Sequence, residues 1–132
     1  MNVPMVLDAS VLIAAMNPDD AHHGAASSLL RRGALQEGLL AHPITVAESA
    51  VGAAQHGRRQ QLQDAYTTLG LKVTVPDSDE PWRLAQRRAA TRLPLPDCCV
   101  LDAAIRCGAS LSTFDSRLAA VARSADVTVV QS

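Results

Sequence analysis

The stretch VLDASVLIA (residues 6–14) places one carboxylate, Asp8, inside an otherwise apolar run near the start of the chain. A buried carboxylate without a partner is costly, so we expect Asp8 to meet a cation, a hydrogen-bond donor or water. The apolar residues 3–7 before it predict a buried strand, and residues 10–16 after it predict a helix that stops at Pro18. Asp8 therefore marks a strand-to-helix junction.

The rest of the chain continues to alternate between helical and strand patterns. Helices are predicted over 19–33, 45–57, 58–69, 79–93, 97–107 and 115–123, and strands over 38–41, 71–75, 109–113 and 127–130. Short strands alternating with helices predict a mostly parallel sheet covered on both faces, which is a three-layer α/β/α sandwich. Ligands of such sheets bind at the carboxyl ends of strands, where Asp8 and Asp115 are expected to emerge.

Length and charge narrow the function classes. The 132 residues predict one domain over 1–132, and 12 basic against 13 acidic residues give no overall attraction to nucleic acid or membrane. Only three aromatic residues are present, so any RNA binding should depend on arginines and shape rather than base stacking. The helix 79–93 carries Arg83, Arg87, Arg88 and Arg92, which we interpret as a solvated helix face.

The cysteines and the apolar runs indicate a soluble cytoplasmic protein. Cys98, Cys99 and Cys107 form no CxxC pair, so we expect small core residues in a reducing compartment rather than a disulfide or cysteine–zinc site. No apolar run approaches the ~18 residues of a membrane span, and the first residues lack a secretion signal pattern. We therefore expect no contact with a membrane.

Four acids have individual structural explanations. Asp8 and Asp115 are each suited to cap the helix that follows, Glu48 matches a capping box with Thr45, and Asp97 is placed to cap its own helix. Each of these roles is the simpler interpretation for one acid alone. The roles do not explain why every acid lies at a helix start or first turn and two follow strands of one sheet.

The acidic motifs together resemble those of PIN-domain nucleases, and more narrowly the VapC toxins of bacterial toxin–antitoxin pairs. The resemblance rests on VLDxSxLI at 6–13, Glu48, LPD at 95–97 and STFD at 112–115, and it covers nearly the whole chain in order. It implies a PIN-like fold, an RNA substrate, a homodimer and a small cognate antitoxin that inserts a segment near the acids. It also implies that Mg²⁺ or Mn²⁺ is held by Asp8, Glu48, Asp97 and Asp115, with Ser10 and Thr113 as polar residues beside them.

The chemistry of RNA cleavage requires such a cluster. Hydrolysis of a phosphodiester needs an activated water, relief of phosphate charge and stabilisation of the leaving oxygen, all of which divalent cations supply. Mg²⁺ prefers oxygen ligands, and it removes the repulsion among neighbouring carboxylates. We therefore expect a Mg²⁺-dependent endoribonuclease in which water is the nucleophile.

Asp102 and the histidines are expected to lie outside the catalytic site. Asp102 follows Asp97 by five residues on the same predicted helix, which turns it away from that acid, so a structural role at the surface is favoured. The histidines show no HxxxH or HxxEH spacing, so we expect solvated or loop positions for His22, His23, His42 and His56.

Three other interpretations can be compared with this one. A haloacid-dehalogenase-type phosphatase needs a second Asp where Ser10 stands, and a receiver-type signalling domain needs a lysine near a late strand, whereas Lys72 is the only lysine. A PIN-like interaction domain with little activity keeps the same fold, and the intact set of four acids argues against it.

Overall fold

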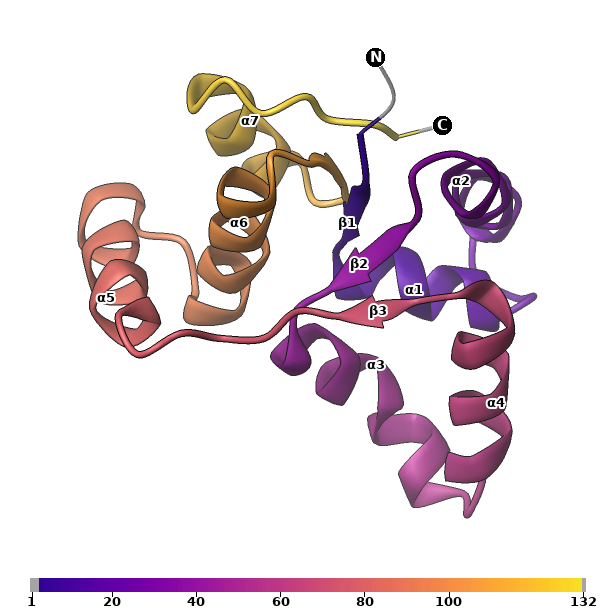
Figure 1. The fold of residues 1–132 in the computed structure, drawn as a ribbon. Helices are drawn as coiled ribbons and strands as arrows, with labels where there is room; N and C mark the ends of the chain where they lie inside the picture. The colour runs from indigo at the N-terminus through magenta and orange to yellow at the C-terminus, as the bar shows by residue number, and fades with distance from the viewer. Residues whose placement is uncertain (1–2, 132) are drawn as a thin grey trace.

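A computed structural model describes residues 3–131 of the chain (Figure 1). The strands are β1 (Met5–Leu7), β2 (Leu39–Ala41), β3 (Lys72–Val73) and β4 (Ser110–Ser112). The helices are α1 (Ala9–Met16), α2 (His23–Leu35), α3 (Pro43–Gln55), α4 (Arg59–Leu69), α5 (Glu80–Thr91), α6 (Leu95–Cys107) and α7 (Ser116–Ser124).

The four strands form one parallel sheet in the order β3-β2-β1-β4. Side chains of β1 alternate between its two faces, because successive residues of a strand point in opposite directions. Val6 joins a buried cluster with residues of α6 and α7, whereas Met5 and Leu7 join a cluster with residues of α1 and α2. Figure 1 shows the corresponding layers, with α5, α6 and α7 on one side of the sheet and α1 and α2 on the other. The predicted three-layer sandwich is confirmed.

Two predicted strands are shorter than expected. The expected strand 71–75 is reduced to β3, an exposed edge strand that stops before Pro76, a residue without the N–H that pairing requires. The expected strand 127–130 forms a single bridge, between Leu111 and Val129. That bridge consists of the Leu111 N–H donating to the Thr128 carbonyl at 2.9 Å and the Val130 N–H donating to the Leu111 carbonyl at 2.8 Å.

Glycines explain two helix ends and one close approach. Gly70 and Gly108 end α4 and α6 in the left-handed region, as predicted, at φ angles of 73° and 59°. Gly33 is expected to end the second helix, but α2 continues to Leu35. Its role is close packing, because a Cβ at Gly33 would lie 2.4 Å from the Leu39 Cδ2 of β2.

The cysteine and membrane expectations are only partly tested. Cys98 and Cys99 are buried as predicted, whereas Cys107, in the last turn of α6, is exposed, so that prediction is wrong. All three thiols are free. Within residues 3–131, every helix is too short or too polar to cross a membrane.

Candidate functional site

Asp8 follows β1 directly, and three donors hold its carboxylate. Its Oδ1 accepts a hydrogen bond from the Ala9 N–H at 2.8 Å, which caps α1. Its Oδ2 accepts from the Ser10 hydroxyl at 2.8 Å and from the Thr113 hydroxyl at 2.7 Å. The side chain is buried, so these bonds supply the partners that the opening stretch of sequence requires.

Ser10 and Thr113 also connect the ends of β1 and β4. The Ser10 Oγ accepts from the Phe114 N–H at 3.2 Å, and the Thr113 Oγ1 accepts from the Asp115 N–H at 3.0 Å. Each hydroxyl therefore donates to Asp8 and accepts from the backbone that follows β4. The two expected supporting residues lie in contact with the first acid and fix it relative to the last.

Asp115 caps α7 and borders the other acids. Its Oδ1 accepts from the Arg117 N–H at 2.9 Å and from the Leu118 N–H at 3.0 Å, so the predicted cap is present. Both cap bonds use the same oxygen, and the residue is exposed. A cap and a role in a charged cluster are therefore compatible for this carboxylate.

Glu48 lies in the second turn of α3, and the capping box expected for it is wrong. The helix begins at Pro43, and its cap is His42, whose Nδ1 accepts from the Ile44 N–H at 3.1 Å. Proline at the first helical position favours this earlier start. Thr45 is consequently buried inside the helix, and its hydroxyl has no hydrogen-bond partner among residues 3–131. Glu48 is exposed and is not used by a cap.

Asp97 lies in the first turn of α6 but does not cap it. That helix begins at Leu95, two residues earlier than expected, and Pro94 occupies the cap position without a side-chain bond. The pKa of Asp97 is raised from 3.8 to about 6, and burial of the carboxyl is the largest cause. The negative charges of the other acids add to this increase, in the order Asp8, Asp115 and Glu48.

The structure thus brings the four predicted acids into one region, from the ends of β1 and β4 and the starts of α3 and α6. The pKa of Glu48, an exposed residue, is also raised, first by the partial loss of water around its carboxylate and then by the charge of Asp8. A like charge disfavours a second charge only at short range. The shifts therefore report an excess of negative charge at this edge of the sheet, which a cation would relieve.

The spacing of the acids suits a hydrated ion. Within the part of the chain that the structure describes, no three of these carboxylates offer oxygens that all lie within 4.8 Å of one another. Mg²⁺ commonly keeps several waters and binds through one or two carboxylates. The oxygen donors and their spacing therefore fit Mg²⁺ better than an ion that needs a closed set of protein ligands.

A second group of possible ligands is formed by His42, Glu80 and Cys99. Their ligand atoms lie within 4.8 Å of one another, and all three residues are buried. His42 lies between β2 and α3, a loop position as expected, but it is buried rather than solvated. The Nδ1 of His42 accepts a backbone hydrogen bond, so its proton is on Nε2, which donates to the Glu80 carboxylate at 2.5 Å. A metal at Nε2 would move that proton to Nδ1, which could then no longer accept the cap bond from the Ile44 N–H, so we assign this group a structural role.

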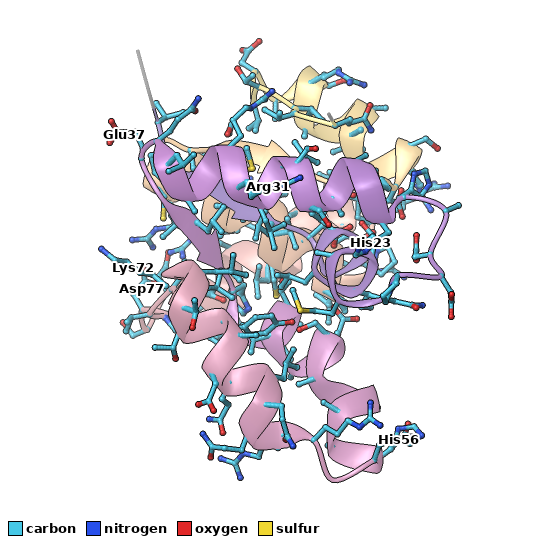
Figure 2. The ribbon with its side chains drawn as sticks, turned by 90° about the vertical axis from the view of Figure 1, so that its right-hand side faces the viewer. His23, Arg31, Glu37, His56, Lys72 and Asp77 are labelled. Atoms are coloured by element: carbon cyan, nitrogen blue, oxygen red, sulfur yellow. The ribbon has the colours of Figure 1, made fainter. Side chains whose placement is uncertain are left out.

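The other histidines lie apart. His22 stacks on Phe114 with ring centroids 4.3 Å apart, and the ring of His23 makes a hydrogen bond of 2.9 Å with the Ala14 carbonyl. Figure 2 shows His56 at the far end of the hairpin formed by α3 and α4, well separated from His23. These positions give no shared ligand site.

Asp102 is structural, as expected, but it is buried rather than at the surface. Arg83 donates to it from Nε and Nη2, both at 3.1 Å, and Arg87 donates from Nε at 2.9 Å. Burial alone would raise the pKa of Asp102, but the hydrogen bonds from the two arginines outweigh burial and lower it. The expectation that all four arginines of the helix 79–93 are solvated is therefore wrong for Arg83 and Arg87, which join α5 to α6.

Comparison with known proteins identifies the family. The sequence profile of the PIN domain matches residues 5–124, and the chain belongs to the PIN domain family. No curated protein sequence matches it at a significant level.

Several solved structures with the same fold are toxins or toxin–antitoxin complexes. A toxin–antitoxin complex from Klebsiella pneumoniae has 22% identity and a TM-score of 0.77, with 96% of each chain covered. VapBC2 from Rickettsia felis, bound to a promoter DNA fragment, has 16% identity and a TM-score of 0.72, with 97% of this chain and 98% of that chain covered. VapC20 from Mycobacterium tuberculosis, a toxin that cleaves the sarcin-ricin loop, has 16% identity and a TM-score of 0.70, with 89% and 94% covered.

Proposed function

We propose that this PIN domain is the toxin of a toxin–antitoxin pair and a metal-dependent endoribonuclease that hydrolyses RNA. The observation that carries the proposal is the convergence of four acids: burial first, and then the charges of the other three acids, raise the pKa of Asp97 to about 6. The cation is Mg²⁺ or Mn²⁺, held by Asp8, Glu48, Asp97 and Asp115. When bound, such an ion activates water and neutralises charge on the phosphate.

The four acids have different positions in this proposal. Asp8 is buried and held by three donors, so its free lone pairs point in a fixed direction before substrate arrives. Asp97 would be stabilised most by a cation, since the charges of the other three acids all raise its pKa. Glu48 and Asp115 are more exposed and complete the rim of the site.

The toxin assignment and the partners rest on the structural relatives. The Klebsiella pneumoniae protein is part of a toxin–antitoxin complex, and VapC20 is a toxin that cleaves the sarcin-ricin loop. By analogy, we propose a small antitoxin that inserts a segment near the acids, an RNA substrate, and a homodimer built from two copies of this domain, each spanning residues 1–132.

The direct test is cleavage of cellular RNA by the purified protein. We expect cleavage with Mg²⁺, none after chelation, and none by Asp97→Asn, because an amide has the size of the carboxylate but not its charge. Asp64→Asn is the matched control, since Asp64 is an exposed acid on α4 that, among residues 3–131, bonds only to Gln60. Wild-type activity in the Asp97 variant, or activity in chelator, would contradict the proposal. A folded protein that cleaves nothing would favour the interaction-domain alternative.

A further inference from the structure

Two arginine side chains meet at the backbone of a third arginine, Arg92, at the turn between α5 and α6. Arg88 donates from Nη1 to the Arg92 carbonyl at 2.7 Å, and Arg117 donates from Nη2 to the same oxygen at 3.2 Å. Arg92 has a φ angle of 63°, in the left-handed region that non-glycine residues seldom adopt. One carbonyl oxygen therefore holds two guanidinium groups close together.

These arginines form no ion pair within the part of the chain that the structure describes. Among residues 3–131, no carboxylate oxygen lies within 4.0 Å of the guanidinium groups of Arg88, Arg92 or Arg117. Arg83 and Arg87, on the same helix, differ because both pair with Asp102. Like charges in contact repel, so the converging arginines favour an anion from outside the chain. All three residues are exposed and accessible to one.

The location of the three arginines connects them to the acids. Arg117 follows Asp115 by two residues on the chain. Its positive charge lowers the pKa of Asp97 and so opposes the increase that the neighbouring acids cause. Arg92 precedes Asp97 by five residues. A phosphate bound at Asp97 would therefore lie close to the charge of Arg117, which meets Arg88 at the Arg92 carbonyl.

We propose that Arg88, Arg92 and Arg117 form a phosphate-binding site for the RNA backbone, next to the phosphate that is cleaved. This inference rests on the proposed function, because it names how the same site holds its substrate. Guanidinium groups bind phosphate through paired hydrogen bonds, and such bonds position the backbone without reading sequence. The four acids repel a polyanion, and the net charge of −1 provides no general attraction, so a local cationic site is needed to hold RNA there.

The test measures RNA binding without cleavage. A labelled single-stranded RNA oligonucleotide is titrated with protein in EDTA over a series of NaCl concentrations. The variant combines Arg88→Gln, Arg92→Gln and Arg117→Gln, because glutamine keeps a donor for the shared carbonyl but removes the charge. We expect its negative slope of log K against log salt to become shallower by about 0.7 for each phosphate that the variant no longer neutralises, with weaker binding to every sequence tested.

The matched control combines Arg31→Gln, Arg58→Gln and Arg59→Gln, which remove the same charge from α2 and from the far end of the α3–α4 hairpin. Arg31 lies on the outer side of α2 (Figure 2). We expect this control to keep the wild-type slope, and Arg117→Lys to keep it as well. Thermal melts followed by circular dichroism will check that every variant is folded at the assay temperature.

The outcomes separate this inference from the nuclease proposal. Equal slopes for the two triple variants, or wild-type protein that binds no RNA, would overturn the phosphate site. Binding of inorganic phosphate at the three arginines, in a protein that does not bind RNA, would also overturn it. The ligand of the site would then be a free anion. The arginine variant could lose the wild-type slope although the wild-type protein cleaves no RNA with Mg²⁺ or Mn²⁺. That result would support the phosphate site and contradict the nuclease proposal.

Discussion

Replacement of Asp97 by Asn should stabilise the metal-free protein at neutral pH. The folded protein raises the pKa of this carboxyl from 3.8 to about 6, mainly through burial and then through the charges of the neighbouring acids. Folded protein therefore binds the Asp97 proton more tightly than the unfolded chain does. The free energy of unfolding consequently falls as the pH rises from 3.8 to about 6, and the full penalty is present above that range.

The size of the effect follows from the shift. A change of about 2 units, at about 1.4 kcal/mol per unit, sets an upper bound of about 3 kcal/mol. Asp97 is partly exposed, and water screens its interactions, so we expect about 1–2 kcal/mol. For a domain of this size the Tm should rise by about 4–8 °C.

The assay is thermal unfolding in EDTA at pH 8 and at pH 4 or below. Asp97→Asn should melt above the wild type at pH 8 and close to it at the lower pH, where the wild-type carboxyl is protonated. Asp115→Ala should melt below the wild type at both, because it removes the two cap bonds of α7. An unchanged or lower Tm for Asp97→Asn at pH 8 would refute the electrostatic account.

Other variants test the structural residues. Asp102→Asn should lower the Tm by roughly 10 °C at pH 7, because Arg83 and Arg87 lose a buried anion. The difference should shrink as the pH falls below 3.8, since the lowered pKa of Asp102 means that the wild-type carboxyl is protonated only in more acidic solution; a difference that does not change with pH would contradict this reason. Gly33→Ala should cost about 1–3 kcal/mol in urea unfolding, since its Cβ would lie 2.4 Å from Leu39 Cδ2. Gly24→Ala in the same helix meets nothing within 4 Å and should add about 0.5–1 kcal/mol, so equal effects of the two would refute the close-packing argument.

Much of the fold follows from local patterns. Strand and helix periods predict the α/β/α layers because each period selects which residues face the core, and glycines predict the ends of α4 and α6. The first helix and the acid before it are predicted for the same reason. Since parallel strands end at one edge, Asp8 and Asp115 are expected near each other before any coordinates are known.

Packing between helices is not predictable in the same way. Arg83 and Arg87 meet Asp102 only because α5 lies against α6, and periodicity does not report which helix faces which. The predicted capping box is wrong because the sequence offers two starts for α3, and Pro43 with His42 is the one that forms. The burial of His42 against Glu80 depends on a residue 38 positions away.

The chemistry of the RNA ends tests the central claim most directly. If the four acids serve hydrolysis by water, the bond from phosphorus to the 3′ oxygen breaks, and the fragments carry 5′-phosphate and 3′-hydroxyl ends. A defined RNA is cleaved with Mg²⁺, and the downstream fragment is ligated without prior kinase treatment, in parallel with an RNA that has one 2′-deoxy nucleotide at the cleaved position. We predict that the fragment ligates and that the 2′-deoxy RNA is still cut. Cyclic phosphate ends, or a strict requirement for that 2′-hydroxyl, would contradict the assignment of the acids and indicate acid–base catalysis by other residues.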